Sequence, residues 1–281
     1  MKKNILVSPI VKWVGGKRQL LPELRALLPR QIKNYTYCEP FLGGGALFFD
    51  IQPAKAIVND INSDLIGLYS VVRDDVENLI TELQKFKNES DEFYSVRAWD
   101  RDKKKYDTLS PLKKSARLVF LNKTCYNGLF RVNNAGEFNT PFGNYKNPNI
   151  VNAPTLRAVN RYFNTNTINF TSCDYTRVLE GLPKKTFVYL DPPYDPVSDT
   201  ANFTGYAKGG FGKEAQINLR KQCDELDRRG IKFMLSNSAT DFIKEQYSSY
   251  KIKVLSAKRN INSIGNKRGD VPEVVVTNYE R

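Results

Sequence analysis

Residues 187–194 combine groups that can act on an amine. Residues 187–190 are apolar or aromatic and predict a short buried strand, which must stop at Asp191 because Pro192 and Pro193 cannot continue a ladder. In an open α/β sheet, ligands bind at this end of a strand. The Asp191 carboxylate and the Pro192 carbonyl can accept hydrogen bonds from an exocyclic amine, and Tyr194 can stack on a planar base. The segment therefore predicts methyl transfer to an amine, although it also fits an ordinary strand-to-loop exit.

Residues near the N-terminus have the properties of a ligand pocket. Gly15 and Gly16 predict a turn into a helix, because the leucines of residues 20–28 recur at helical spacing. Trp13 can cover an adenine ring, and Lys17 can neutralise a carboxylate. The same pair also fits a purely structural role at the start of a helix.

A strand, a glycine turn and a helix start are predicted in residues 36–49. Gly43 and Gly45 permit a close approach of the backbone to a ligand. The next predicted strand ends at Asp60, where a carboxylate can bind a ribose diol. Phe48 stands where a dinucleotide-binding fingerprint has its last glycine. The pattern therefore favours S-adenosylmethionine over NAD as the cofactor.

Residues 126–145 contain two turn signals, Asn-Gly and Asn-Asn-Ala-Gly, with strand-like residues between them. This pattern predicts a β-hairpin that carries Arg131 and several aromatic residues. Such a hairpin suits the major groove of DNA, because arginine can bond guanine bidentately and an aromatic wedge can enter the base stack. A plain surface hairpin is the alternative.

The composition agrees with a polyanionic partner. The chain has 281 residues, 41% of them apolar, and a formal net charge of +13. A chain of this size can bury a full core, and neutralising DNA phosphates would account for the charge. No apolar run reaches the ~18 residues of a membrane span. We therefore expect a cytoplasmic protein that binds double-stranded DNA.

The residue types also exclude several classes of enzyme. There is no histidine, which excludes a Ser-His-Asp triad and a zinc deaminase site. The four cysteines are far apart and never follow a proline, so neither a zinc site nor a cytosine-C5 methyltransferase nucleophile is expected. No cluster of carboxylates predicts a metal site.

Three motifs make the chain resemble the Dam-type DNA adenine-N6 methyltransferases of the D12 class, alpha group. They are Trp-Val-Gly-Gly-Lys at 13–17, Pro-Phe-Leu-Gly-Gly-Gly at 40–45 and Asp-Pro-Pro-Tyr at 191–194. The chain is similar in the same way to the adenine methyltransferase of the DpnII restriction system. The likeness covers nearly the whole chain in the motif order of the family.

The resemblance assigns roles to individual residues. It implies that catalysis involves Asp191, Pro192, Pro193 and Tyr194. It implies an S-adenosylmethionine site lined by Trp13, Lys17, Phe41, Gly43, Gly45, Asp60, Asp174 and Asp191, although Asp174 fits a structural role equally well. It implies DNA contacts from Lys12, which would touch a base, from Tyr126 as an intercalating wedge, from Asn127 and Tyr145 on the backbone, and from Leu129, Arg131 and Pro141 on the outer bases of GATC.

We predict an α/β fold, a Rossmann-like methyltransferase sheet with helices on both faces. The catalytic domain comprises residues 1–62 and 152–281, and residues 63–151 form an inserted helical and hairpin domain that recognises the target. Residues 196–212 are rich in small residues and suggest a lid. The basic segment 259–269 fits either a phosphate contact or a simple hairpin loop.

The predicted function is methyl transfer from S-adenosylmethionine to adenine N6 of a base flipped out of duplex DNA, in GATC. The alternatives are a cytosine-N4 methyltransferase, which needs the same grip on an amine, and a DNA-binding protein without catalysis. A separate restriction endonuclease is the expected companion if the enzyme belongs to a restriction-modification system. The sequence does not determine an oligomeric state.

Overall fold

A seven-stranded mixed sheet forms the centre of the computed structural model, which describes residues 3–196, 211–258 and 270–280. Its strands are β1 Thr36–Glu39, β2 Lys55–Asn59, β3 Thr167–Thr171, β4 Thr186–Leu190, β5 Lys232–Ser238, β6 Lys251–Lys258 and β7 Asp270–Thr277. They lie in the order β3-β2-β1-β4-β5-β7-β6. All neighbouring pairs are parallel except those of β7, which is antiparallel to β5 and β6. The predicted α/β sheet is confirmed.

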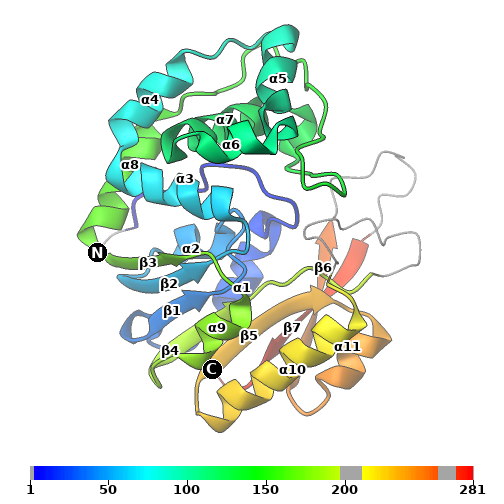
Figure 1. The fold of residues 1–281 in the computed structure, drawn as a ribbon. Helices are drawn as coiled ribbons and strands as arrows, with labels where there is room; N and C mark the ends of the chain where they lie inside the picture. Colours follow the sequence, from blue (N-terminus) through cyan, green and yellow to red (C-terminus); the bar gives the residue numbers. More distant parts are fainter. Residues whose placement is uncertain (1–2, 197–210, 259–269, 281) are drawn as a thin grey trace.

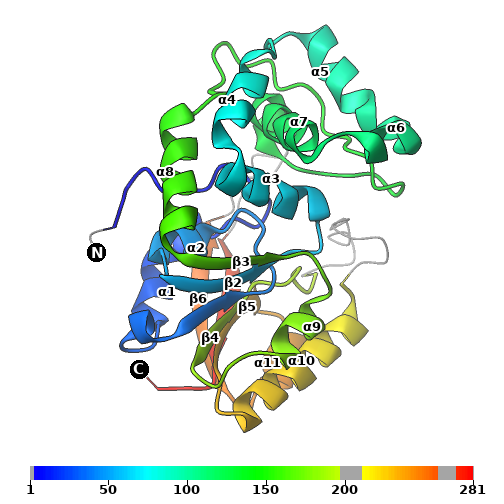
Figure 2. The same cartoon turned by 60° about the vertical axis from the view of Figure 1, so that its left-hand side comes forward.

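Helices cover both faces of the sheet because its strands bury side chains on both sides. In β1, Tyr37 belongs to one apolar cluster and Cys38 to the other, as the alternation of a strand requires. The first face is covered by α1 Leu21–Leu27, α2 Ala46–Ile51 and α8 Ala153–Thr165, and the second by α9 Tyr175–Glu180, α10 Lys213–Arg228 and α11 Asp241–Gln246. Figure 2 shows these two groups on opposite sides of the strands.

A layer of helices lies above the sheet in Figure 1 and comes from the chain between β2 and β3. It contains α3 Ser63–Asp74, α4 Val76–Gln84, α5 Ser90–Arg97, α6 Lys103–Thr108 and α7 Pro111–Thr124. Asn62 caps α3 by accepting a hydrogen bond from the Leu65 amide at 3.0 Å. Leu65 and Leu68 pack in the same cluster as Phe48 of α2, so the core continues from the sheet into this layer.

The segment predicted as a hairpin, residues 126–145, folds back on itself with very little strand structure. A short 3-10 helix, η4 Tyr126–Gly128, opens it, and two isolated bridges, Cys125 with Phe142 and Val132 with Phe138, close it. The prediction of two regular strands between the turns was wrong in their length, because only isolated bridges form. Pro141 has no amide hydrogen to donate, and the Thr140 hydroxyl bonds the Leu129 carbonyl at 2.6 Å in place of a ladder. We call residues 126–145 the hairpin below.

Other differences from the sequence-based expectation are small. Strand β4 ends at Leu190, one residue earlier than predicted. The helices α9 and α11 were not predicted, because six residues each give too short a periodic pattern. The chain also contains the short 3-10 helices η1 Arg18–Leu20, η2 Ile32–Asn34 and η3 Ala98–Arg101. Nearly all of the predicted lid, and the basic segment 259–269, lie outside the described residues.

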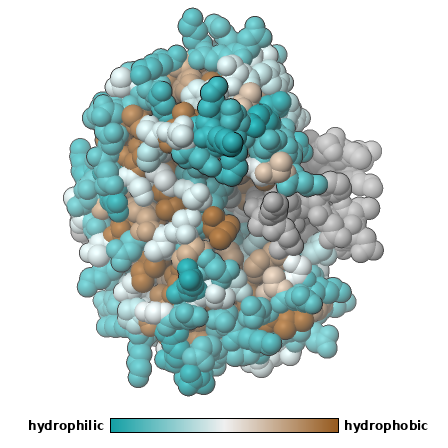
Figure 3. All heavy atoms as spheres, viewed as in Figure 1, coloured by the Kyte–Doolittle hydropathy of each residue, from teal (hydrophilic) through white to brown (hydrophobic). Residues whose placement is uncertain are grey.

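The surface is mainly hydrophilic on the face shown in Figure 3. Hydrophobic residues interrupt it over the middle of that face, between the helical layer above and the helices below the sheet. In the described part of the chain, no helix combines the length and the apolar character that crossing a bilayer requires.

Candidate active site

The site lies where the sheet changes direction. From β1 the chain proceeds outward through β2 to β3, and from β4 it proceeds the other way to β5. Strands β1 and β4 are parallel neighbours, so their carboxyl ends meet at this switch point, where open α/β sheets bind ligands. The glycine turn after β1 and the Asp-Pro-Pro-Tyr segment after β4 are thereby brought to one edge.

Lys17, Asp191 and Tyr194 come together at this edge. The Lys17 ammonium lies 2.8 Å from Oδ1 of Asp191 and 4.6 Å from the centre of the Tyr194 ring. It also donates to the Gly15 carbonyl at 2.6 Å, so the turn at Gly15 and Gly16 holds the lysine end of the ion pair. Burial raises the pKa of the Asp191 carboxyl, and the nearby Lys17 charge opposes that shift. The arrangement places a carboxylate, an ammonium and an aromatic face around one point.

Two acidic residues that the sequence interpretation did not select surround this group. The Tyr194 hydroxyl donates to Glu273 of β7 at 2.7 Å, and the Tyr37 hydroxyl donates to Glu39 of β1 at 2.7 Å. Burial raises the pKa of Glu39 well above its usual range. Glu39 ends a strand at the same edge, which is a signal the sequence offered. The position of Glu273 beside Tyr194 depends on strand order and left no local signal.

The backbone after β4 is held by buried side chains of α10 and β5. Gln216 donates to the Pro193 carbonyl at 2.9 Å and accepts from Asn237 at 3.0 Å. Asn237 in turn accepts from the Asp195 amide at 3.0 Å. Within the described ranges, no hydrogen bond reaches the Pro192 carbonyl. Buried side chains therefore support the loop, and no described residue occupies the Pro192 carbonyl.

The glycine turn after β1 wraps around Asp60. The Asp60 carboxylate accepts from the amides of Gly43 at 2.8 Å and Asn62 at 2.9 Å, while burial raises its pKa. Gly43 has φ +50°, and a Cβ there would lie 2.8 Å from the Trp13 ring. Only glycine fits this approach without a shift of the indole. The next residue after the carboxylate, Ile61, is 62% exposed and offers an apolar surface beside it.

The remaining residues predicted to contact the cofactor lie at the same edge of the sheet. Asn59, at the end of β2, donates to the Pro40 and Cys173 carbonyls, each at 3.0 Å, and so ties β1, β2 and β3 together. Phe41 packs on Tyr175 with ring centres 4.9 Å apart. Asp174 caps α9 by accepting from the Thr176 amide at 2.9 Å, which is the structural role that the sequence also allowed.

The hairpin meets the site through Trp13 and Lys12. The Trp13 ring stacks on Phe130 with centres 4.5 Å apart and an interplanar angle of 14°. The backbone of Lys12 exchanges two hydrogen bonds with the Asn122 side chain of α7, each 2.8 Å long. Asn122 also donates to the Gly128 carbonyl at 3.2 Å. The predicted cofactor pocket and the hairpin thus share a boundary.

Apart from Lys12, the residues predicted to touch DNA belong to the hairpin. Tyr126 is 56% exposed, and the hydroxyl of Tyr145 accepts a hydrogen bond from the Asn127 amide at 2.9 Å. Arg131 is exposed and donates to the Asn139 side chain across the hairpin at 2.8 Å. Leu129 is partly buried, and the Pro141 carbonyl accepts from the Tyr126 amide at 2.9 Å. Tyr126, Asn127 and Arg131 therefore lie on the surface of one folded unit.

A group of cations lies beside the base of the hairpin. Burial, with the neighbouring charges of Lys12 and Arg18, lowers the pKa of Lys123 to about 8. Like charges gathered in this way are unfavourable on their own and favour an anionic partner.

Comparison with known proteins agrees with this geometry. Residues 13–261 match the model of the D12 class N6 adenine-specific DNA methyltransferase family. The chain is 40% identical to the type II methyltransferase M1.LlaDCHI of Lactococcus lactis subsp. cremoris, over 99% of this chain and 98% of that protein. It is 42% identical to the type II methyltransferase M.MjaIII of Methanocaldococcus jannaschii, over 97% of this chain and 99% of that protein. It is 34% identical to the DNA adenine methylase of Escherichia coli, over 98% of this chain and 95% of that protein. The chain belongs to the D12 class of N6 adenine-specific DNA methyltransferases.

Proposed function

We propose that this adenine methyltransferase uses S-adenosylmethionine to methylate N6 of an adenine that is flipped out of duplex DNA, within the sequence GATC. The observation that carries the proposal is the group formed by Lys17, Asp191 and Tyr194 at the switch point of the sheet, beside the glycine turn. It provides acceptors for an amine and an aromatic face for a base in one place.

The residues at the edge of the sheet suit S-adenosylmethionine. Asp60 offers a carboxylate to a ribose diol, and the exposed Ile61 and the Trp13 ring offer apolar faces to an adenine. Asp191 supplies negative charge towards an ammonium and a sulfonium. When bound, S-adenosylmethionine supplies a methyl group that its sulfonium makes electrophilic.

The residues of this chain orient the amine that receives the methyl group. The Asp191 carboxylate and the Pro192 carbonyl accept the two N6 hydrogens, which draws the nitrogen lone pair out of conjugation and directs it towards the donor. Tyr194 stacks on the flipped base. Asp191 also stabilises the positive charge that develops on N6, and no covalent intermediate with the protein is needed.

Base flipping and site recognition are assigned to the hairpin. N6 of a paired adenine is inaccessible to this site, so the base must leave the stack at a cost of roughly a few kcal/mol. The exposure of Tyr126 supports its role as a wedge, and Arg131, Leu129 and Pro141 would read the outer pairs of GATC. Lys12, Asn127 and Tyr145 would hold the DNA beside them.

The names of two relatives support a biological setting. Both are type II methyltransferases. By this analogy the enzyme would protect GATC sites from a separate cognate restriction endonuclease in the cytoplasm.

A methyl-transfer assay tests the proposal. The enzyme is incubated with labelled S-adenosylmethionine and duplexes that contain GATC, GTTC or neither site, and the labelled nucleoside is identified. Label on N6-methyladenine from the GATC duplex alone is the expected result. Label spread over other adenines would reject the site assignment, and label on cytosine would reject the target base. Binding of cofactor and DNA without transfer would indicate a DNA-binding protein that lacks the reaction.

A further inference from the structure

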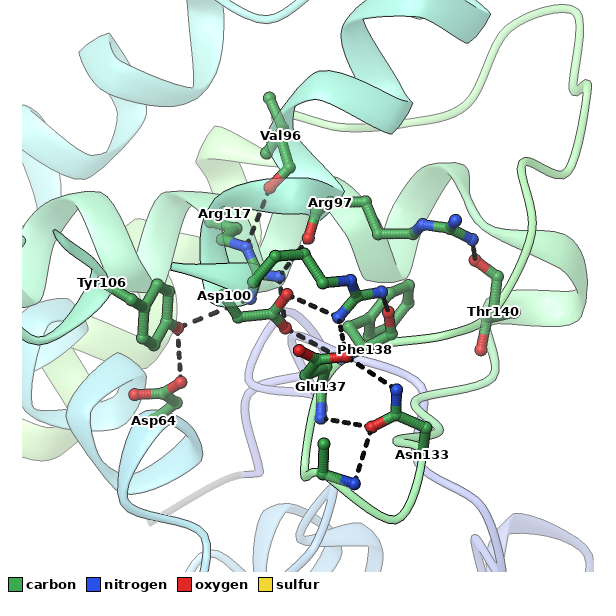
Figure 4. A network of polar contacts seen from close by, with 12 residues as sticks. Asp64, Val96, Arg97, Asp100, Tyr106, Arg117, Asn133, Glu137, Phe138 and Thr140 are labelled. Carbon is green, nitrogen blue, oxygen red and sulfur yellow. Dashed lines mark hydrogen bonds and ion pairs between the residues drawn. The ribbon is translucent and has the colours of Figure 1, made fainter. Parts of the chain in front are cut away.

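The hairpin is joined to the helical layer by a network of charged side chains, shown in Figure 4. The backbone bonds of the hairpin itself are few. The Asn139 amide donates to the Arg131 carbonyl at 3.0 Å, and the Asn133 amide donates to the Glu137 carbonyl at 2.9 Å. Residues on either side of Phe138 therefore pair with the opposite arm, and the amide and carbonyl of Phe138 point outward, as alternate residues of a strand do.

Asp100 and Arg101 occupy both outward groups of Phe138. The Phe138 amide donates to Oδ2 of Asp100 at 2.8 Å, and its carbonyl accepts from Arg101 at 2.6 Å. This is the pairing that a neighbouring strand would supply, made here by the side chains of two consecutive residues in η3. Arg101 also pairs with Asp100 at 2.9 Å and with Glu137 at 3.1 Å. We call Asp100 and Arg101 the clamp.

The clamp is itself anchored in the protein interior. Arg117 of α7, 5% exposed, lies 2.7 Å from Asp100 and donates to the carbonyls of Val96 and Arg97 at the end of α5. The charges balance, because two arginines face the carboxylates of Asp100 and Glu137. Arg101 is already paired with Asp100, Glu137 and the Phe138 carbonyl, so its role differs from that of an unpaired cation that binds a phosphate.

The clamp lies one residue away from the side chain that holds Arg131. Asn139 follows Phe138 directly and accepts from the Arg131 guanidinium at 2.8 Å. Phe138 is buried, so the clamp fixes this point of the hairpin against the small apolar cluster beneath it. Bidentate contact with a base requires a guanidinium placed within a few tenths of an ångström.

We infer that Asp100 and Arg101 are positioning residues for sequence discrimination: they set the place of Arg131 relative to the outer base pair of the DNA site without touching the DNA. The inference rests on the proposed role of the hairpin in reading DNA. It predicts that loss of the clamp relaxes the choice of site, whereas the cofactor site and the Asp191 group, which belong to other elements, are unaffected.

Arg101→Met tests the inference, because methionine keeps a long apolar side chain but cannot donate. The measured quantity is the ratio of kcat/KM for a GATC duplex to that for a duplex with one outer G·C pair replaced by A·T. Arg131→Ala and the double variant are measured beside it. Arg157→Met is the matched control, because Arg157 is 54% exposed and pairs with Glu77 on the outer surface.

The ratio is expected to fall roughly tenfold in Arg101→Met and in Arg131→Ala, with no further fall in the double variant. The control and the dissociation constant of S-adenosylmethionine should keep the wild-type values. A wild-type ratio in Arg101→Met, with a reduced one in Arg131→Ala, would overturn the inference alone. A wild-type ratio in Arg131→Ala would reject the reading role of the hairpin and the inference with it.

A second variant covers loss of folding. Should circular dichroism show that Arg101→Met is unfolded, Glu137→Gln removes one charged partner of Arg101 and keeps the shape of the side chain. A reduced ratio in this folded variant supports the inference, and an unchanged ratio overturns it.

Discussion

Asp191 and Lys17 depend on one another. The Lys17 side chain is only 6% exposed and that of Asp191 19%, so each charge is largely removed from water. A buried charge is costly unless it is paired, and removing one partner leaves the other uncompensated. Burial raises the pKa of Asp191, and the Lys17 charge opposes this shift by favouring the ionised carboxylate.

Asp191→Ala should reduce the methylation rate by roughly 100-fold or more, because an acceptor directed at the developing charge is lost. DNA binding should stay close to that of the wild type, since the residue directly follows β4 and lies outside the hairpin. Single-turnover methylation and fluorescence anisotropy with the same duplex measure the two effects. Loss of DNA binding with the chemistry retained would contradict the assigned role, and Asp191→Asn shows whether the charge or only an acceptor oxygen is required.

Lys123 makes the molecule sensitive to pH in a defined direction. Its folded-state pKa of about 8 lies below the ~10.4 of an exposed lysine. Below about pH 8 both the folded and the unfolded chain carry the proton, and the buried charge lowers stability. Between these two values only the unfolded chain keeps it, so this residue's contribution to stability rises with pH.

The DNA affinity should change in the opposite direction. Raising the pH through about 8 removes one positive charge beside Lys12, so the salt slope of DNA binding should become shallower by about one unit between pH 7 and pH 9. Lys123→Arg, which stays charged, should abolish this change. Affinities titrated against salt at both pH values give the slopes. If the arginine variant shows the same change, another group is responsible.

At the scale of elements, the loop after β4 acquires its shape from α10 and β5. The chain of hydrogen bonds from Pro193 through Gln216 to Asn237 connects three elements that are distant in sequence. Gln216 is 1% exposed, and Asn237 is fully buried. Buried polar groups of this kind lower stability when a partner is removed, so the loop that carries Asp191 is rigid only while the chain of bonds is complete.

Gln216→Met should lower the free energy of unfolding by ~1–3 kcal/mol, because the Pro193 carbonyl and the Asn237 amide both lose a partner. The methylation rate should fall more than the affinity for DNA does. Asn218→Ala, an exposed position on the same helix, is the control and should change neither quantity appreciably. Urea denaturation and single-turnover assays measure the effects. Equal losses in both variants would show that the helix, and not the buried amide, is responsible.

At the scale of the whole molecule, the net charge of +13 and the layered architecture act together. Cations near the base of the hairpin and the exposed hairpin residues belong to the helical layer and to the segment before α1, whereas Asp191 and Tyr194 directly follow strand β4 of the sheet. Trp13 contacts both regions, because its ring lies against Gly43 in the turn after β1 and stacks on Phe130 of the hairpin. A duplex bound by one layer can thus present a base to the other.

The affinity for DNA should therefore depend strongly on salt, and the affinity for S-adenosylmethionine only weakly. If four phosphates are neutralised, a fourfold increase in salt lowers the DNA affinity by roughly 100-fold, because counterion release sets the slope. Parallel titrations of both ligands at 50 and 200 mM salt provide the comparison. A DNA affinity that is insensitive to salt would reject phosphate neutralisation as the source of binding.

Local rules were enough for several features. Two prolines end β4 beside Asp191 because they cannot continue a ladder, and the apolar run before them is long enough to mark a strand. Asp60 follows a strand in the same way, and the motifs around both predicted the family that the comparisons then showed. The fold class followed from the alternation of such strands with helices.

Other features depend on partners that are far apart in the chain. Tyr194 donates a hydrogen bond to Glu273, which lies 79 residues away in the sequence. The Phe138 amide donates to Asp100, which lies 38 residues away. Such pairs have no periodic signature, because strand order and the packing of helices decide which side chains meet. The lowered pKa of Lys123 has the same origin, since burial and the charges of Lys12 and Arg18 arise only when the layers assemble. The chemistry of the site was thus encoded locally, while its support and the position of the hairpin were set by tertiary packing.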